Sequence, residues 1–282
     1  MKFPTNRLPS WSLATWLFII SLFLHISLVL VLRHYKNPTL WENGGIAEYV
    51  FAGKGLSFDF SRPGEPTSWQ APGYPYLLAF FWHLFGFKTS AGYLCISLLQ
   101  ALAVASMIYP MSSLTERWFG PRAAKWAAII VCLMPLYLWY PTRLHHTAFV
   151  MAMHPWLLWS WVCVADRGRV PHIVAAGVGT GLCALFQPVL LAIYGPLSCA
   201  FVLAAAFKKS WGQFSRFLAA GILTLIVLTP WTVRNWNVHG RLLLVKNSFG
   251  KELWMGNNPH ATGTGYAVGG ETEITNAYPP KS

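Results

Sequence analysis

The sequence predicts an all-α protein that crosses a membrane several times. Of its 282 residues, 55% are hydrophobic and only 11% are charged, whereas soluble domains average about 25% charged residues. Long stretches of the chain carry no charge at all. A membrane-spanning helix needs about 20 consecutive apolar residues. The segment from Trp11 to Leu32 supplies such a run, with His25 as its one titratable side chain.

Seven apolar segments predict about seven transmembrane helices. The first is too long for the apolar core of a signal peptide, and no small-residue cleavage site follows it, so we expect it to remain as an anchor. In the fifth segment, Gly177 and Gly181 lie four residues apart, a spacing that favours close helix packing. The seven segments are 11–32, 91–113, 123–140, 145–165, 172–187, 189–207 and 214–232.

The basic residues predict the orientation of these helices. Ten of the 21 Lys and Arg residues lie near the N-terminus or in short connections, which is the positive-inside pattern of cytoplasmic segments. We therefore expect a transmembrane module over residues 1–232 in an inner, or plasma, membrane. Its N-terminus is expected inside, and the segments 33–90 and 233–282 outside. The ten residues are Lys2, Arg7, Arg117, Arg122, Lys125, Arg167, Arg169, Lys208, Lys209 and Arg216.

The net charge of +12 follows from this topology and predicts no nucleic-acid partner, since no aromatic-and-basic motif accompanies it. The five cysteines lie inside apolar runs and form no CxxC pair. They are interpreted as small buried residues. We predict neither disulfides nor a metal site built from these side chains.

The first outer segment, 33–90, is expected to be structured. The stretch "GGIAEYVFAG" predicts a short helix with Ile46, Val50 and Gly53 on one face and a glycine cap at Gly53 or Gly55. The stretch "LSFDF" alternates like an extended segment. Residues 71–87 predict an interfacial helix that is opened by proline and too short to span the membrane. The outer tail, 233–282, is rich in Gly, Thr and Asn towards its end and is expected to be loop there.

The acidic residues make Glu42 and Glu48 candidates for chemistry. Seven of the nine acids lie in the predicted outer segments and none lies within a span, which argues against an ion-coupled transporter. A Glu42 carboxylate at a dry interface could take a proton from a sugar hydroxyl. It could equally do no more than stabilise the N-terminus of the next helix. Glu48 lies about 240° further around a regular helix, so the two acids are not expected to face one site.

Two groups of basic side chains lie at predicted outer ends of spans. Arg234 and Asn235 follow the seventh span, and Arg143 lies with His145 and His146 at the turn after the third. Such an arginine either extends to the interface as an anchor or binds a lipid-borne phosphate through two parallel hydrogen bonds. The chain has no nucleotide-binding loop. A transferase working outside the cytoplasm would therefore need a donor such as a polyprenyl-phosphate sugar.

Three stretches resemble a known family when taken in order. They are "WENGGIAEYVFAGKGLSF", "PTSWQAPGYPYLLAFFWHLFG" and "TPWTVRNWNVHGRLLLVKNSFGKELWMGNNPHATG". They are similar to the GT-C membrane glycosyltransferases, above all to glycosyltransferase family 39 and its RgtA/B/C/D-like relatives. That superfamily includes protein O-mannosyltransferases and the lipid A aminoarabinose transferase. The likeness extends over nearly the whole chain.

The resemblance implies an inverting transferase with a polyprenyl-phosphate sugar as co-substrate and a glycan, lipid or protein as acceptor. It implies Glu42 as general base, with Glu48 as the alternative or supporting acid. Arg234 and Asn235 would lie near the donor phosphate, with Arg143 and His146 as further candidates. A divalent metal stays open as a cofactor. The chain departs from its relatives at Trp41-Glu42, where many carry Asp, and at Gln187, where a basic residue is common.

Two other readings stay open at this point. Relatives continue for several more spans beyond the position of Ser282, so the chain could be a fragment, a minimal form or a non-catalytic membrane module. A transporter or lipid flippase is the third reading. The outward clustering of the acids favours the first two.

Overall fold

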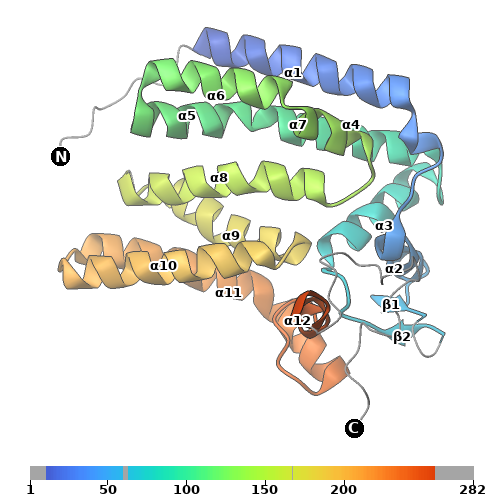
Figure 1. Cartoon of the computed structure of the whole chain (residues 1–282). Coiled ribbons are helices and arrows are strands. Elements are labelled where there is room, and N and C mark those ends of the chain that lie inside the picture. The colour runs from blue at the N-terminus through green and yellow to red at the C-terminus, as the bar shows by residue number, and fades with distance from the viewer. Residues whose placement is uncertain (1–10, 60–62, 167, 258–282) are drawn as a thin grey trace.

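The structure, a computed structural model, describes residues 11–59, 63–166 and 168–257. It is predominantly helical, with long helices lying side by side and a layer of shorter elements at one end (Figure 1). The long helices are α1 (Trp11–Leu32), α4 (Ser90–Ser106), α5 (Ile108–Phe119), α6 (Pro121–Leu133), α8 (Thr147–Asp166), α9 (Val170–Phe186), α10 (Val189–Phe207) and α11 (Trp211–His239). The prediction of an all-α polytopic membrane protein is confirmed.

Each of the seven predicted spans is helical. Within the described residues, five helical stretches are long and apolar enough to cross a membrane, with α4 and α5 counted as one. A sixth crossing results if α6 and the short α7 (Pro135–Trp139) are joined across their 42° bend. The remaining predicted span is α9, an apolar helix of 17 residues.

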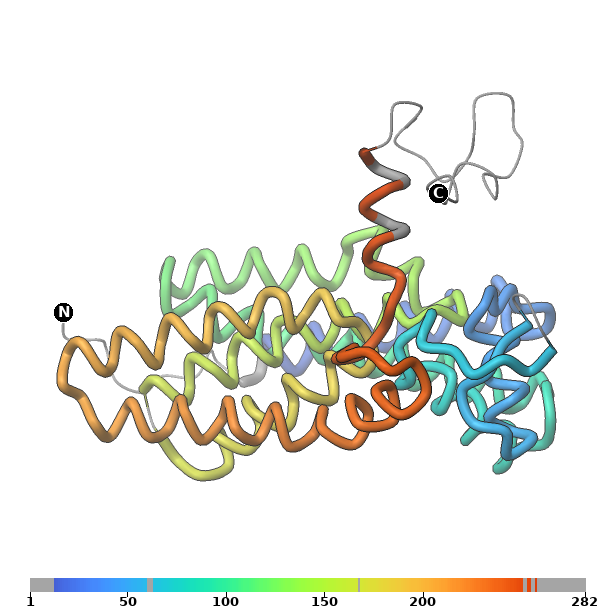
Figure 2. The backbone as a smooth tube through the Cα atoms, turned by 90° about the horizontal axis from the view of Figure 1, so that it is seen from below, coloured from blue at the N-terminus to red at the C-terminus, as the bar shows by residue number. Residues whose placement is uncertain are grey.

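Several helices extend further than the sequence suggested. α5 continues to Phe119, so Arg117 lies in its last turn and not in a loop. α11 continues to His239 and places Arg234 and Asn235 on a helix. The tail contains α12 (Phe249–Asn257), which stands out from the bundle in Figure 2. The expected loop at the end of the tail lies, beyond residue 257, outside the described part of the chain.

Helix α8 joins two groups of helices. Its first half, including Ala148 and Ala152, packs in a core with α1, α5 and α6. Its second half, including Trp161 and Val164, packs in a core with α9, α10 and α11. Figure 1 shows α8 between the two groups.

The glycines of α9 pack as predicted. A Cβ atom on Gly177 would lie 2.4 Å from the backbone oxygen of Ala220, and one on Gly181 would lie 2.6 Å from Cβ of Val227. Both partners belong to α11. The two helices approach each other closely because these positions carry no side chain.

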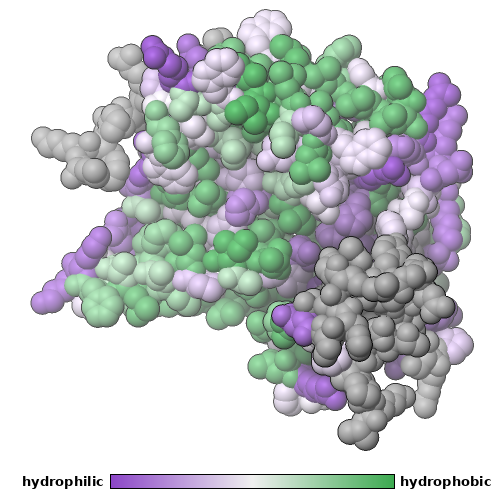
Figure 3. All heavy atoms as spheres, viewed as in Figure 1, coloured by the Kyte–Doolittle hydropathy of each residue, from purple (hydrophilic) through white to green (hydrophobic). Residues whose placement is uncertain are grey.

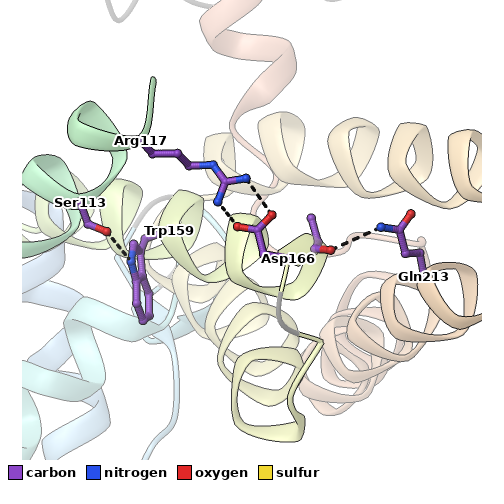
Figure 4. Close-up of polar contacts among 6 residues, drawn as sticks. Ser113, Arg117, Trp159, Asp166 and Gln213 are labelled. Atoms are coloured by element: carbon purple, nitrogen blue, oxygen red, sulfur yellow. Dashed lines mark hydrogen bonds and ion pairs between the residues drawn. The ribbon is translucent and has the colours of Figure 1, made fainter. Parts of the chain in front are cut away.

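The basic connections between helices gather at one end of the molecule, which we call the basic end. It comprises the turn at Gly120, the connection 166–170 and the turn 208–210 (left in Figure 1). Here Arg117 of α5 forms an ion pair with Asp166 of α8, and the indole of Trp159 donates a hydrogen bond to Ser113 Oγ at 3.2 Å (Figure 4). The face in Figure 3 is mostly hydrophobic along the helices and hydrophilic towards their ends.

The opposite end, which we call the outer-segment end, carries the smaller elements. They are the 3-10 turns η1 (His34–Lys36) and η2 (Tyr140–Thr142), the helices α2 (Trp41–Phe51) and α3 (Gly73–Phe85), and the short antiparallel strands β1 (Ser57–Phe58) and β2 (Glu65–Pro66). The expected short helix, extended segment and proline-opened helix are all present. Tyr74, Leu78 and Trp82 of α3 are buried against α2 and α4, so this layer is fixed to the bundle.

Candidate functional site

Helix α2 holds Glu42 at its first turn. Its two glycines leave room for other side chains: a Cβ on Gly44 would lie 2.4 Å from Cβ of Leu40, the residue before the helix, and one on Gly45 would lie 2.4 Å from the ring of Phe58 in β1. The helix ends as expected, because Gly53 adopts a left-handed conformation with φ 74° and Lys54 N–H donates to Tyr49 O at 2.9 Å. The sequence around Glu42 therefore holds the start of α2 tightly against strand β1.

The two acids of α2 have different neighbours. Glu42 interacts electrostatically with His145, which lies in the turn before α8. Glu48 forms an ion pair with Lys88, with 2.7 Å between Oε1 and Nζ. Both partners of that pair are exposed to solvent for more than two fifths of their side-chain surface. Glu42 and Glu48 therefore lie in separate electrostatic environments, as their spacing on a regular helix requires.

Glu42, His145, His146 and Lys246 form a group that we call the Glu42 cluster. The His145 and His146 rings lie 4.2 Å apart between centroids. Burial lowers the pKa of His145, and the charge of Glu42 partly opposes that effect. Burial, then the neighbouring His145 and Lys246, lower the pKa of His146 to about 4. Both imidazoles are therefore neutral at neutral pH.

The neutral state of His145 has a defined tautomer. Its Nδ1 accepts the backbone N–H of Thr147 at 3.3 Å, and the Thr147 hydroxyl lies 2.7 Å from the same atom. Because Nδ1 accepts, the ring proton lies on Nε2. No acceptor among the described residues is bonded to the Nε2–H group, which can therefore donate to an anionic oxygen.

Gln100 of α4 fixes the backbone of the turn that carries the two histidines. Its side-chain amide donates to the carbonyl oxygens of Arg143 at 2.7 Å and Pro141 at 3.2 Å. The hydroxyl of Tyr74 donates to Gln100 Oε1 at 3.2 Å, and the Tyr74 ring meets His146 edge-on at 6.2 Å. A buried glutamine whose amide groups are satisfied in this way restricts the positions of Arg143 and His146.

Arg143 itself is exposed. Its guanidinium carbon lies 4.8 Å from the centre of the Trp139 ring. Among the described residues it has no carboxylate partner. Such a stacked arginine keeps its N–H groups available for an anion at this end of the molecule.

Arg234, Asn235, Ser68 and His239 form a second group, which we call the Arg234 cluster. The Arg234 guanidinium donates to Leu56 O, Thr67 O and Ser68 Oγ, each at 2.8 Å. Ser68 Oγ donates to Asn235 Oδ1 at 2.7 Å and lies 2.9 Å from His239 Nε2. Since the serine proton goes to Asn235, the histidine must donate through Nε2. Arg234 thereby joins α11 to residues 56–68.

Asn235 connects this group to the chain that follows α11. The residue is fully buried, and its amide nitrogen donates to Leu243 O at 2.9 Å and Val245 O at 3.0 Å. Lys246 follows directly, and Asn247 N–H donates to Ser68 O at 2.9 Å. These bonds hold Lys246 where its charge acts on His146. The two clusters are therefore adjacent and connected through residues 243–247.

A polar groove of about 520 Å³ opens on the Glu48 side of α2. Trp41, which is 65% exposed, Glu48 and Lys88 are among its lining residues. Trp41 and Lys88 both have positive φ, 52° and 55°, a conformation that is costly for residues other than glycine. Lys36, Asn37 and Tyr93 also line the groove.

The described residues provide no metal site of ordinary composition. Across 11–59, 63–166 and 168–257, no three His, Cys, Asp or Glu side chains are grouped so that they could hold a metal ion. His145, His146 and Glu42 do not form such a set.

Comparison of the sequence with models of protein families shows which family the chain belongs to. A family model described as dolichyl-phosphate-mannose-protein mannosyltransferase matches residues 69–233, which is more than half of the 282 residues. The chain belongs to this family of GT-C membrane glycosyltransferases. No curated protein and no solved structure matches the chain.

The matched range of the mannosyltransferase family includes some candidate residues and not others. Arg143 and His146 lie within it, whereas Glu42, Glu48, Arg234 and Asn235 lie outside residues 69–233. The resemblance inferred from the three sequence stretches is confirmed for the family. The roles of these individual residues stay predictions.

Sequence reasoning missed the contributions of Gln100 and Lys246. Gln100 stands in an apolar run, "CISLLQALAV", where a lone amide side chain needs buried partners. Lys246 follows three leucines and a valine in "RLLLVKNSFG". Both signals were visible, but neither indicates which partner the side chain meets.

Proposed function

We propose that this glycosyltransferase moves a sugar from a polyprenyl-phosphate donor to an acceptor hydroxyl, with inversion at the sugar carbon and Glu42 as general base. The observation that carries the proposal is the state of Glu42. Its carboxylate forms no hydrogen bond or ion pair with the part of the chain that the structure describes, and it lies next to a pair of neutral histidines. A base must have such free acceptor capacity.

The proposed step is a single displacement. The acceptor O–H gives its proton to the Glu42 carboxylate while the oxygen attacks C1 of the sugar. The bond from C1 to the phosphate oxygen breaks, and its electron pair leaves with the lipid phosphate. Attack from the face opposite the leaving group inverts the configuration at C1.

The leaving phosphate is proposed to lie against the basic side chains at the outer-segment end. Arg143 and Lys246 supply positive charge, and the neutral rings of His145 and His146 supply N–H donors. Arg234 is proposed to contact the same phosphate through the edge of its guanidinium that carries Nε, while Asn235 positions residues 243–247. Charge-assisted hydrogen bonds from such groups favour the phosphate most as its negative charge develops.

The polar groove beside Glu48 is proposed as the approach for the acceptor. It adjoins Trp41, the residue before Glu42, and its exposed indole offers an apolar face of the kind that packs under a sugar ring. Glu48 and Lys88 supply hydrogen-bonding groups along its wall. Acceptor and donor would then meet at the first turn of α2.

The proposed orientation places this chemistry outside the cytoplasm. The basic end collects the predicted cytoplasmic connections, and the outer-segment end carries both candidate clusters. Cysteines introduced at Lys54, an exposed residue of the outer segment, and at Ser210 would test it in intact cells with a membrane-impermeant thiol reagent. We expect labelling at position 54 and protection at position 210, and the opposite pattern would reverse the model.

The activity is tested with membranes that contain the full chain and labelled polyprenyl-phosphate sugars. We expect label to move to an acceptor with wild type and with Glu48→Gln, and not with Glu42→Gln. Lys246→Met should raise the donor KM about 10-fold, as expected for loss of one charge-assisted contact. If none of the donors yields labelled product while the chain is folded and inserted, the non-catalytic reading is favoured.

A further inference from the structure

A small pocket at the basic end lies far from both clusters. It has a volume of about 60 Å³ and lies between α1, α5 and α6. Leu13 and Ala14 line it from α1, Ser112 and Glu116 from α5, and Pro121, Ala124, Lys125 and Ala128 from α6. The proposed transfer reaction uses none of these residues.

The pocket contains two buried oxygen atoms without partners. Ser112 is only 2% exposed, and neither its Oγ nor Oε2 of Glu116 has a hydrogen bond among the described residues. More than nine tenths of buried polar groups in proteins have a partner, and leaving one unsatisfied costs about 1–3 kcal/mol. The two residues lie one turn apart on α5, so one donor group could satisfy both.

The charges around the pocket indicate the chemistry of that donor group. Glu116 offers a carboxylate inside the pocket, and Lys125 offers an ammonium group at its rim. The two side chains form no ion pair with each other. A ligand with a compact cation and, a few atoms away, an anion would match both.

The position of the pocket indicates where such a ligand comes from. The exposed aromatic residues Trp16, Trp118, Phe119 and Trp126 surround this end of α1, α5 and α6. Exposed tryptophans of membrane proteins concentrate at the depth of the lipid headgroups. The pocket therefore lies where a headgroup can enter it from the bilayer.

We propose that this pocket binds the headgroup of an aminophospholipid on the cytoplasmic leaflet. The primary ammonium donates to Glu116 Oε2 and Ser112 Oγ, and the lipid phosphate lies against Lys125. A trimethylammonium headgroup has no N–H to donate to either oxygen atom. A glycerol headgroup has no cation for Glu116. The site is independent of the transfer reaction, which occupies the opposite end.

The test measures lipid binding to the purified full chain. Phosphatidylethanolamine, phosphatidylcholine and phosphatidylglycerol are titrated separately into the detergent-solubilised protein, and bound lipids are counted by native mass spectrometry. We expect one phosphatidylethanolamine to be retained and to raise the melting temperature, with at least about 10-fold preference over the other two lipids. Glu116→Gln, which keeps the shape of the side chain, should remove that preference.

Arg122→Gln is the matched control. It removes one charge from the same end of α6 at a residue that does not line the pocket, so it should keep the preference. Equal binding of the three lipids by wild type would overturn the proposal, as would unchanged selectivity in Glu116→Gln.

Discussion

The Glu42 cluster and the Arg234 cluster lie side by side but use their polar groups in opposite ways. In the Arg234 cluster, the guanidinium of Arg234 and the amide of Asn235 donate at least four hydrogen bonds to backbone carbonyls. In the Glu42 cluster, the side chains interact through charge and ring contacts, and Glu42 keeps its acceptor capacity within the described part of the chain.

This difference distinguishes groups that stabilise the structure from groups that are available to bind or react with a substrate. A group whose hydrogen-bonding capacity is used by the protein contributes to stability and position. A group with free capacity in a partly buried place can receive a substrate proton or phosphate. The free acceptor capacity of Glu42 within the described residues supports its proposed role as base, whereas the bonds of Arg234 and Asn235 hold Leu56, Thr67 and residues 243–245 in place.

Substitution of Glu42 is expected to have the largest effect, a loss of sugar-transfer rate. Glu42→Gln keeps the shape of the side chain but removes the base, so the rate of sugar transfer should fall by about 10²–10⁴-fold. The melting temperature should stay at the wild-type value because the carboxylate has no hydrogen bond to lose within the described residues. Wild-type transfer by Glu42→Gln, with loss of transfer in Glu48→Gln, would exchange the roles of the two acids.

Substitution of Arg234 is expected to have the next largest effect, a loss of stability. Arg234→Ala leaves the carbonyls of Leu56 and Thr67 without this donor, so the free energy of unfolding should fall by on the order of 1.5–3 kcal/mol. Arg234→Lys should recover only part of this free energy, because the single ammonium group of Lys cannot donate to several acceptors from one rigid plane as a guanidinium does. Thermal melting in detergent and donor KM are measured together. A raised KM with unchanged melting would show that phosphate binding is its entire role.

A pH-dependent effect should come from His146. Its pKa is about 4 in the folded protein and 6.5 as a free side chain. Between about pH 4 and pH 6.5, the unfolded chain therefore binds a proton at this imidazole that the folded chain does not. The stability from this group is complete above pH 6.5 and is lost as pH falls towards about 4. His146→Phe should make the melting temperature less dependent on pH across this interval, and an unchanged slope would contradict the assignment.

The smallest effect should be on the Glu48–Lys88 pair. An exposed ion pair contributes about 0–1 kcal/mol, so Glu48→Gln and Lys88→Met should each change the melting temperature little. The coupling energy from the double-mutant cycle should be no more than about 1 kcal/mol. A larger coupling would mean that this pair holds the groove in shape.

The sequence predicted the helices well because their signals are local. Apolar length predicted a helix in each of the seven segments, although only five or six of the helical stretches are long enough to cross a membrane. The spacing of Gly177 and Gly181 predicted a close helix contact, now seen with α11. The helix around Ile46 and its end at Gly53 followed from periodicity and a capping glycine. The candidate site was less predictable. Arg234 was recognised as an outer arginine, but its bonds to Leu56 and Thr67 join residues more than 160 positions apart.

The sequence by itself determined that this chain is a multi-pass helical membrane protein, and three of its stretches indicated the glycosyltransferase family. Only the tertiary structure decided that Glu42 meets His145, that Lys246 acts on the neighbouring His146, and that Glu48 pairs with Lys88. The physical reason is the range of the interactions. Helix formation and membrane insertion depend on neighbouring residues along the chain, whereas the charge and hydrogen-bond partners of a side chain depend on how distant helices pack.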